Sequence, residues 1–199
     1  MTPEIFSFPT SVYVPLGLAF FGLGTGYLIY GPQELFGFPE RSPAVDWANG
    51  WYGVWMPGFL QFLCGTYILV GLTWFHVFQG APLYAAGILT TVFGVHWFAI
   101  GLSRMRQGDM RVNGFMAVAF FLVSILGLIV FAEAGDIPVA ILFVGLSCVY
   151  FSGIFSYFGI GAPFSVRAQG FFHTITGLWL MYLTYGIVLD LALGWHLTI

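Results

Sequence analysis

Residues 47–103 read WANGWYGVWMPGFLQFLCGTYILVGLTWFHVFQGAPLYAAGILTTVFGVHWFAIGLS, and this stretch contains no Asp, Glu, Lys or Arg. One helix needs about 20 mostly apolar residues to cross the roughly 30 Å hydrocarbon core of a bilayer. The stretch is therefore too long for one crossing and suits two. Its QGAP segment, residues 79–82, supplies the glycine and proline that end one helix and begin the next.

The same pattern continues in both directions, because each further charge-free gap is long enough for one helix. Only 7% of the residues are charged and 59% are hydrophobic, whereas about a quarter of the residues in a soluble domain are charged. The sequence predicts an all-α integral membrane protein, a single domain over residues 1–199 with six transmembrane helices and short loops. The expected spans are 15–30, 52–75, 83–103, 114–132, 138–158 and 170–191.

The charged residues predict an orientation and exclude two classes of function. All five cations are arginines and fall in alternate loops of the six-span arrangement, at Arg41, Arg104, Arg106, Arg111 and Arg167. The positive-inside rule therefore places both termini outside the cytoplasm. The arginines are too sparse to follow a phosphate backbone, so nucleic acid is not an expected partner. With neither a fixed cation nor a buried carboxylate expected in any span, an ion-coupled pump is disfavoured.

Small and neutral polar residues characterise the expected bundle interior. Gly22 and Gly26 form a GxxxG pair, which predicts either close packing within one bundle or a subunit interface or constriction. Neutral polar groups can hydrogen-bond a small polar solute, although a Ser or Thr hydroxyl often bonds to its own helix instead. The polar residues expected along a substrate path include Thr25, Gln61, Thr91, His96 and Tyr182.

The residues give little support to an enzyme or a cofactor protein. Helical histidines can ligate haem, but His76 lies near a span end and His96 lies in mid-span, so their depths do not match. The sequence contains neither an HExxH nor a GxSxG motif. Cys64 and Cys148 both lie in apolar runs, which is typical of small core residues. We therefore expect no enzyme activity, no cofactor and no metal site.

Four stretches resemble the acetate uptake transporter family, also called the succinate-acetate permease family. They resemble that family's PLGLxxFG, QxxxG, TSYGxxW and YLAMGEVLN motifs, and they occur in the same order. The matching residues are Pro15-Leu16-Gly17-Leu18 with Phe21-Gly22, Gln61 with Gly65, Thr91 with Phe93, Gly94 and Trp97, and Tyr182-Leu183 with Gly186, Val188 and Leu189.

The resemblance implies a homohexamer in which each protomer carries its own path for acetate and related short carboxylates, including succinate. It also implies a narrow apolar constriction in each path. Phe21 and Phe93 match aromatic positions of the family, and Ser147 is the nearest match in the fifth span. We therefore expect a constriction at Phe21, Phe93 and Ser147, with Trp97 beside the polar path residues. The expected partners are a small solute, the lipid bilayer and further copies of this chain.

Two departures from that family leave alternatives open. Val12-Tyr13-Val14 replaces the family's Asn-Pro-Ala, and acetate permeases keep their termini in the cytoplasm. The urea and short-amide channel family has termini outside, and its KSxAV and FG motifs resemble Arg41-Ser42 with Ala44-Val45 and Phe93-Gly94. That family's TAxIPA pattern is missing here. A urea or amide channel, and a non-transporting subunit of a larger membrane complex, therefore remain alternatives.

Overall fold

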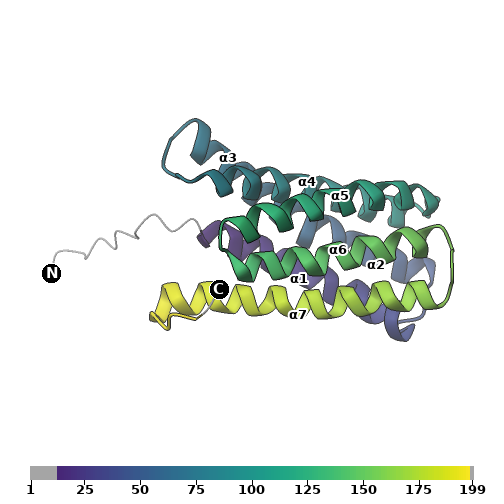
Figure 1. Ribbon diagram of the computed structural model, residues 1–199. Helices are drawn as coiled ribbons and strands as arrows, with labels where there is room; N and C mark the ends of the chain where they lie inside the picture. The colour runs from purple at the N-terminus through teal and green to yellow at the C-terminus, as the bar shows by residue number, and fades with distance from the viewer. Residues whose placement is uncertain (1–12, 198–199) are drawn as a thin grey trace.

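The computed structural model describes residues 13–197, and all regular structure in that range is helical (Figure 1). Residues 43–73 form one continuous helix that contains a short π-helical stretch. The elements are α1 (Tyr13–Phe36), α2 (Pro43–Gly53), η1 (Val54–Phe59), α3 (Leu60–Thr73), α4 (Ala81–Met105), α5 (Arg111–Glu133), α6 (Ile137–Tyr157) and α7 (Phe164–Leu193).

Within residues 13–197, five helices are long and apolar enough to cross a membrane, which makes this chain an integral, multi-pass membrane protein of α-helices. They are the continuous helix Pro43–Thr73 together with α4, α5, α6 and α7. The remaining expected span, 15–30, lies in α1, which is not one of these five.

The second long helix begins earlier than expected, at Pro43 rather than near residue 52. The Ser42 hydroxyl accepts a hydrogen bond from the Val45 N–H at 3.3 Å, and proline occupies the first turn, where its missing N–H costs nothing. Farther along, α3 ends at Thr73 and α4 begins at Ala81, inside the QGAP segment.

Glycines bring helices of this chain into close contact with one another. A Cβ atom on Gly22 would lie 2.4 Å from the Met56 carbonyl oxygen, and one on Gly26 would lie 2.7 Å from the Pro57 ring. The GxxxG pair of α1 therefore packs on η1 within one chain. Gly94 packs in the same way, since its Cβ would lie 2.5 Å from the Phe62 backbone nitrogen, which joins α4 to α3.

The connecting segments gather at two opposite ends of the bundle (Figure 1). Segments 37–42, 106–110 and 158–163 lie at one end, which also holds the exposed arginines and is here called the arginine end. Segments 74–80 and 134–136 lie at the other end, with the start of α1 and the end of α7. α1 runs beside α7, and α5 packs mainly on α6.

Candidate functional site

Three cavities follow one another along the bundle, each lined by α1, α4 and α6. On α1 their lining begins with Leu16 to Leu23, continues with Tyr27 and Tyr30, and ends with Gln33 and Glu34. The lining of α4 follows the same order, from Pro82 through His96 to Arg104. We call these cavities the first cavity, the inner void and the vestibule.

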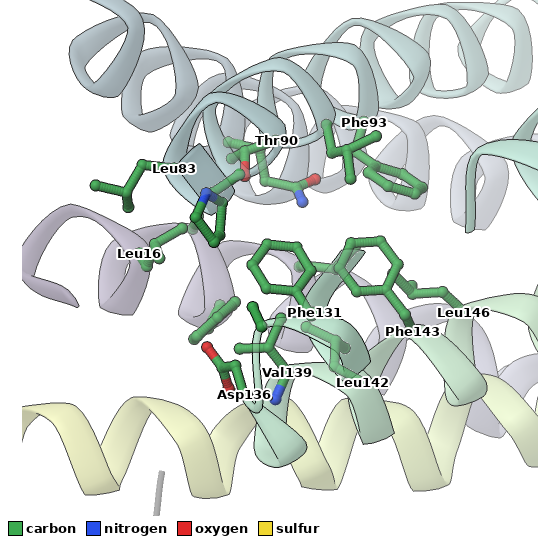
Figure 2. Close-up of a pocket in the computed structure, with 18 of the residues that line it drawn as sticks. Leu16, Leu83, Thr90, Phe93, Phe131, Asp136, Val139, Leu142, Phe143 and Leu146 are labelled. Carbon is green, nitrogen blue, oxygen red and sulfur yellow. Dashed lines mark hydrogen bonds between the residues drawn. The ribbon is translucent and has the colours of Figure 1, made fainter. Parts of the chain in front are cut away.

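The first cavity has a volume of about 270 Å³ and lies between α1, α4 and α6 (Figure 2). Leu83 and Asp136 lie toward the end that holds segments 74–80 and 134–136, while Phe93 and Leu146 close the opposite side (Figure 2). Most of the lining is apolar. The polar side chains that line it are Gln61, Gln79, Thr90 and Asp136.

Asp136 lies in the turn before α6, where it caps that helix and places a carboxylate at the end of the first cavity. Its carboxylate accepts a hydrogen bond from the Val139 N–H at 3.1 Å, so it caps α6. Burial raises the pKa of Asp136 above its usual value, because a carboxylate removed from water is harder to ionise. This end of the first cavity therefore loses its negative charge more readily on acidification than it would with an exposed aspartate.

A group of buried rings separates the first cavity from the inner void and the vestibule. We call the row of three cavities the passage. The centroid of the Phe93 ring lies 5.2 Å from that of Phe120, 5.8 Å from that of Tyr150 and 6.5 Å from that of Phe143. Leu146 lies next to Phe143 in the lining of the first cavity (Figure 2). We call these five side chains the aromatic barrier. All five are at most 9% exposed, so the barrier excludes water.

Beyond the barrier lies the inner void, of about 10 Å³, whose lining includes Tyr27, His96, Trp97, Tyr150 and His173. In the part of the chain that the structure describes, the Tyr27 hydroxyl, His96 Nδ1 and Trp97 Nε1 are buried without a hydrogen-bond partner. Unpaired buried polar atoms are rare in folded proteins. The inner void is therefore a polar site next to the aromatic barrier.

The vestibule has a volume of about 370 Å³ at the arginine end, where Arg41, Glu34, Glu40 and Arg104 all line it. Arg104 Nε donates to Asp46 Oδ1 at 2.8 Å, and both side chains are only 5% exposed. A second Arg104 nitrogen, Nη2, donates to Gln33 Oε1. Asp46 also accepts from Arg41 Nε at 3.1 Å, so two arginines share this one carboxylate.

This pair corrects the expectation that no span contains a fixed cation or a buried carboxylate. Arg104 lies in α4 and Asp46 lies in the long helix Pro43–Thr73, both of which can cross a membrane. A second, partly buried pair joins α1 to α7, with His173 Nδ1 at 2.6 Å from Glu34 Oε2. Neither pair follows from a local motif, because Asp46 and Arg104 are 58 residues apart and Glu34 and His173 are 139 residues apart.

Four of the expected site residues lie along this passage. Gln61 lines the first cavity and is 4% exposed. Phe93 lines that cavity and is part of the aromatic barrier. His96 and Trp97 line the inner void.

Five expected residues lie elsewhere. Phe21 is 40% exposed on the outer surface of α1, whereas its neighbour Phe20 is 8% exposed and lines the first cavity. Ser147 is buried, and its hydroxyl donates to the Phe143 carbonyl at 2.7 Å. Thr91 donates to the Gly87 carbonyl at 2.8 Å, where α3 meets α4. Thr25 is half-buried outside the lining of the three cavities, and Tyr182 is 39% exposed, with its ring stacked on Trp179.

The fold and the passage define a class of protein, namely an α-helical multi-pass membrane protein with a series of cavities along its axis. No protein-family model and no curated protein matches the sequence. Among solved structures, the bacterial acetate channel SatP superposes with a TM-score of 0.68 at 17% identity, over 90% of this chain and 94% of that one. The chain therefore has the fold of an acetate channel.

Proposed function

We propose that this chain is a membrane channel or facilitator for small monocarboxylic acids such as acetate, and a member of the acetate uptake transporter family. The observation that carries the proposal is the passage inside one chain, in which the aromatic barrier separates the first cavity from the inner void and the vestibule. The motif resemblance and the SatP-like fold support it.

The charges along the passage favour the undissociated acid as the permeating form. Asp136 lies at one end, and Glu34 and Glu40 line the vestibule at the other. The buried Arg104 is already paired with Asp46. Arg41 and Arg104 balance the two carboxylates of the vestibule, so a carboxylate meets no net positive charge there before it reaches the dry aromatic barrier, where an unpaired charge is costly. Transport should therefore rise as the pH falls toward the carboxyl pKa of the solute, about 4 to 5.

The proposed constriction is the aromatic barrier around Phe93, and the adjoining wall is formed by Phe20 in place of Phe21. Phe20 is buried and faces the first cavity, whereas Phe21 faces outward. Gln61 and Thr90 supply polar groups before the barrier, and His96 and Trp97 supply them after it.

The remaining parts of the proposal concern the whole protein. α1 is proposed as a sixth crossing, because its 24 residues pack against α7 and against the continuous helix Pro43–Thr73. Residues 1–199 then form one six-span domain with both termini outside the cytoplasm. A homohexamer with one passage per protomer is proposed from the family resemblance, as is the transport of succinate.

Uptake of labelled acetate into proteoliposomes at about pH 5.5, near the acid's pKa, tests the proposal. Empty liposomes of the same composition give the background, which is essential because undissociated acetic acid also crosses lipid. Uptake above that background supports the acetate channel. Uptake equal to the background contradicts it, and labelled urea flux in the same vesicles would then favour the amide channel. Stoichiometric co-purification with other polypeptides would favour an accessory subunit.

A further inference from the structure

The inner void brings unpaired polar atoms of two helices together. His96 Nδ1 and Trp97 Nε1 come from α4, and the Tyr27 hydroxyl comes from α1; in the part of the chain that the structure describes, none of the three has a hydrogen-bond partner. The three side chains are at most 4% exposed, and their rings adjoin, with centroids 5.9 Å apart for Tyr27 and Trp97 and 6.2 Å apart for His96 and Trp97.

Leaving such atoms unpaired is unfavourable, since a buried polar group without a partner has lost its hydrogen bonds to water and gained none in the protein. The void has a volume of about 10 Å³, and about 10–15 Å³ on this measure holds one water molecule. Its size and its polar lining therefore match one polar guest the size of a water molecule. A carboxyl group has three non-hydrogen atoms, so it enters only when the rings that line the void move apart.

We propose that the inner void is a binding station for one such polar group, occupied by water at rest and by the carboxyl group of the solute during transit. The Trp97 indole N–H can only donate, so the guest must offer an acceptor. The Tyr27 hydroxyl can donate or accept, and His96 Nδ1 does one or the other according to its tautomer. An undissociated carboxyl group meets these requirements, since its carbonyl oxygen accepts from Trp97 and its hydroxyl donates to His96.

The position of the station gives it a role in passage. Tyr150 belongs to both the aromatic barrier and the lining of the void, and its ring centroid is 5.4 Å from that of His96. On the other side, Tyr30, Tyr157 and Gln169 line both the void and the vestibule. A solute leaving the barrier therefore meets the station before it reaches vestibule water. This role rests on the proposed function, whereas the existence of the station does not.

Solid-state NMR of the ¹⁵N-labelled protein in liposomes tests the station directly. The Trp97 indole signal is assigned by its loss in Trp97→Phe, and magnetisation transfer from water to that signal is measured. We expect a water contact at Trp97 without solute, and its partial replacement by a contact to the carboxyl carbon of added ¹³C-acetate. An indole with neither contact would overturn the station, and a water contact that acetate leaves unchanged would overturn its use by the solute.

A transport measurement separates this inference from the proposed function. His96→Phe preserves an aromatic ring and removes the polar atom, whereas His96→Gln restores a polar group. We expect acetate uptake to fall several-fold in His96→Phe and to recover in His96→Gln. Equal uptake by His96→Phe and the wild type would contradict the inference and leave the channel standing. A wild type without uptake would contradict the channel, while the NMR contacts would still decide whether the station exists.

Discussion

At the residue scale, the proposed constriction depends on Phe93. Its ring contacts Phe120, Phe143 and Tyr150 and separates the first cavity from the inner void. Replacing Phe93 with alanine removes that ring and joins the two spaces, so we expect faster acetate uptake and weaker discrimination against larger acids. Comparing acetate and butyrate uptake checks this prediction. Phe151→Ala is the control, because Phe151 is 52% exposed on the outer surface of α6.

Phe20 faces the first cavity and Phe21 faces outward, so substituting each in turn tests which side of α1 lines the solute path. The motif resemblance alone favoured Phe21, but only Phe20 lines the first cavity. We expect Phe20→Ala to change the acetate uptake rate and Phe21→Ala to leave it near the wild-type rate. The opposite result, with the effect confined to Phe21→Ala, would place the passage on the other side of α1.

Asp136 gives a prediction about pH. Its pKa is raised by burial, so its negative charge, present near neutral pH, is lost early as the pH falls. Asp136→Asn removes the charge at every pH but keeps a side-chain oxygen that can cap α6. We therefore expect higher uptake than wild type near neutral pH and a smaller difference between the two in acid. Parallel pH profiles of the two proteins would show that Asp136 does not influence entry.

At the element scale, two kinds of contact hold the helices together. The first is the close approach of α3 and α4 at Gly94, where a Cβ atom would lie 2.5 Å from the Phe62 nitrogen. Gly94→Ala should therefore destabilise the protein by about 1–3 kcal/mol, although alanine normally favours a helix over glycine. Thermal unfolding in detergent measures this effect. Ala119→Val adds more volume at an exposed position of α5 and should have little effect.

The second contact is the buried pair between Asp46 and Arg104, which ties the start of α2 to the end of α4. Asp46→Ala leaves the Arg104 guanidinium buried beside Gln33 without a counter-charge, which typically costs about 3–5 kcal/mol. Thermal unfolding should show a large loss of stability. Asp109→Ala removes the partner of Arg111 in an exposed pair, with side chains 52% and 76% exposed, and should change stability little.

At the scale of the whole molecule, most of the helical architecture follows from the spacing of charged residues. Charge-free runs indicate long helices, and the QGAP segment indicates where α4 begins. The early start of α2 could also have been recognised, because Ser42 followed by Pro43 is a typical helix beginning. The spacing alone could not show which charges near helix ends turn inward, so Arg104 and Asp46 were assigned to loops.

The candidate site could be predicted only in part, because its geometry depends on helix rotation. A rotation of about 100° per residue separates Phe20 from Phe21, and the apolar sequence of α1 does not fix which of them faces inward. The His173 and Glu34 pair depends on the contact between α1 and α7, and no local pattern indicates that contact. Phe93 and Trp97, expected from the motif resemblance, and His96, expected as a mid-span polar residue, are all buried on α4, and their roles in transport stay predictions.

If the solute passes through the first cavity inside one chain, then filling that cavity blocks transport. Ala86 lines the cavity and is 5% exposed, so Ala86→Phe places a ring in the path, whereas Ala119→Phe adds the same ring on the exposed face of α5. With both variants shown to be folded by gel filtration, we predict acetate uptake at the empty-liposome level for Ala86→Phe and at the wild-type level for Ala119→Phe. Wild-type uptake by Ala86→Phe would contradict the claim.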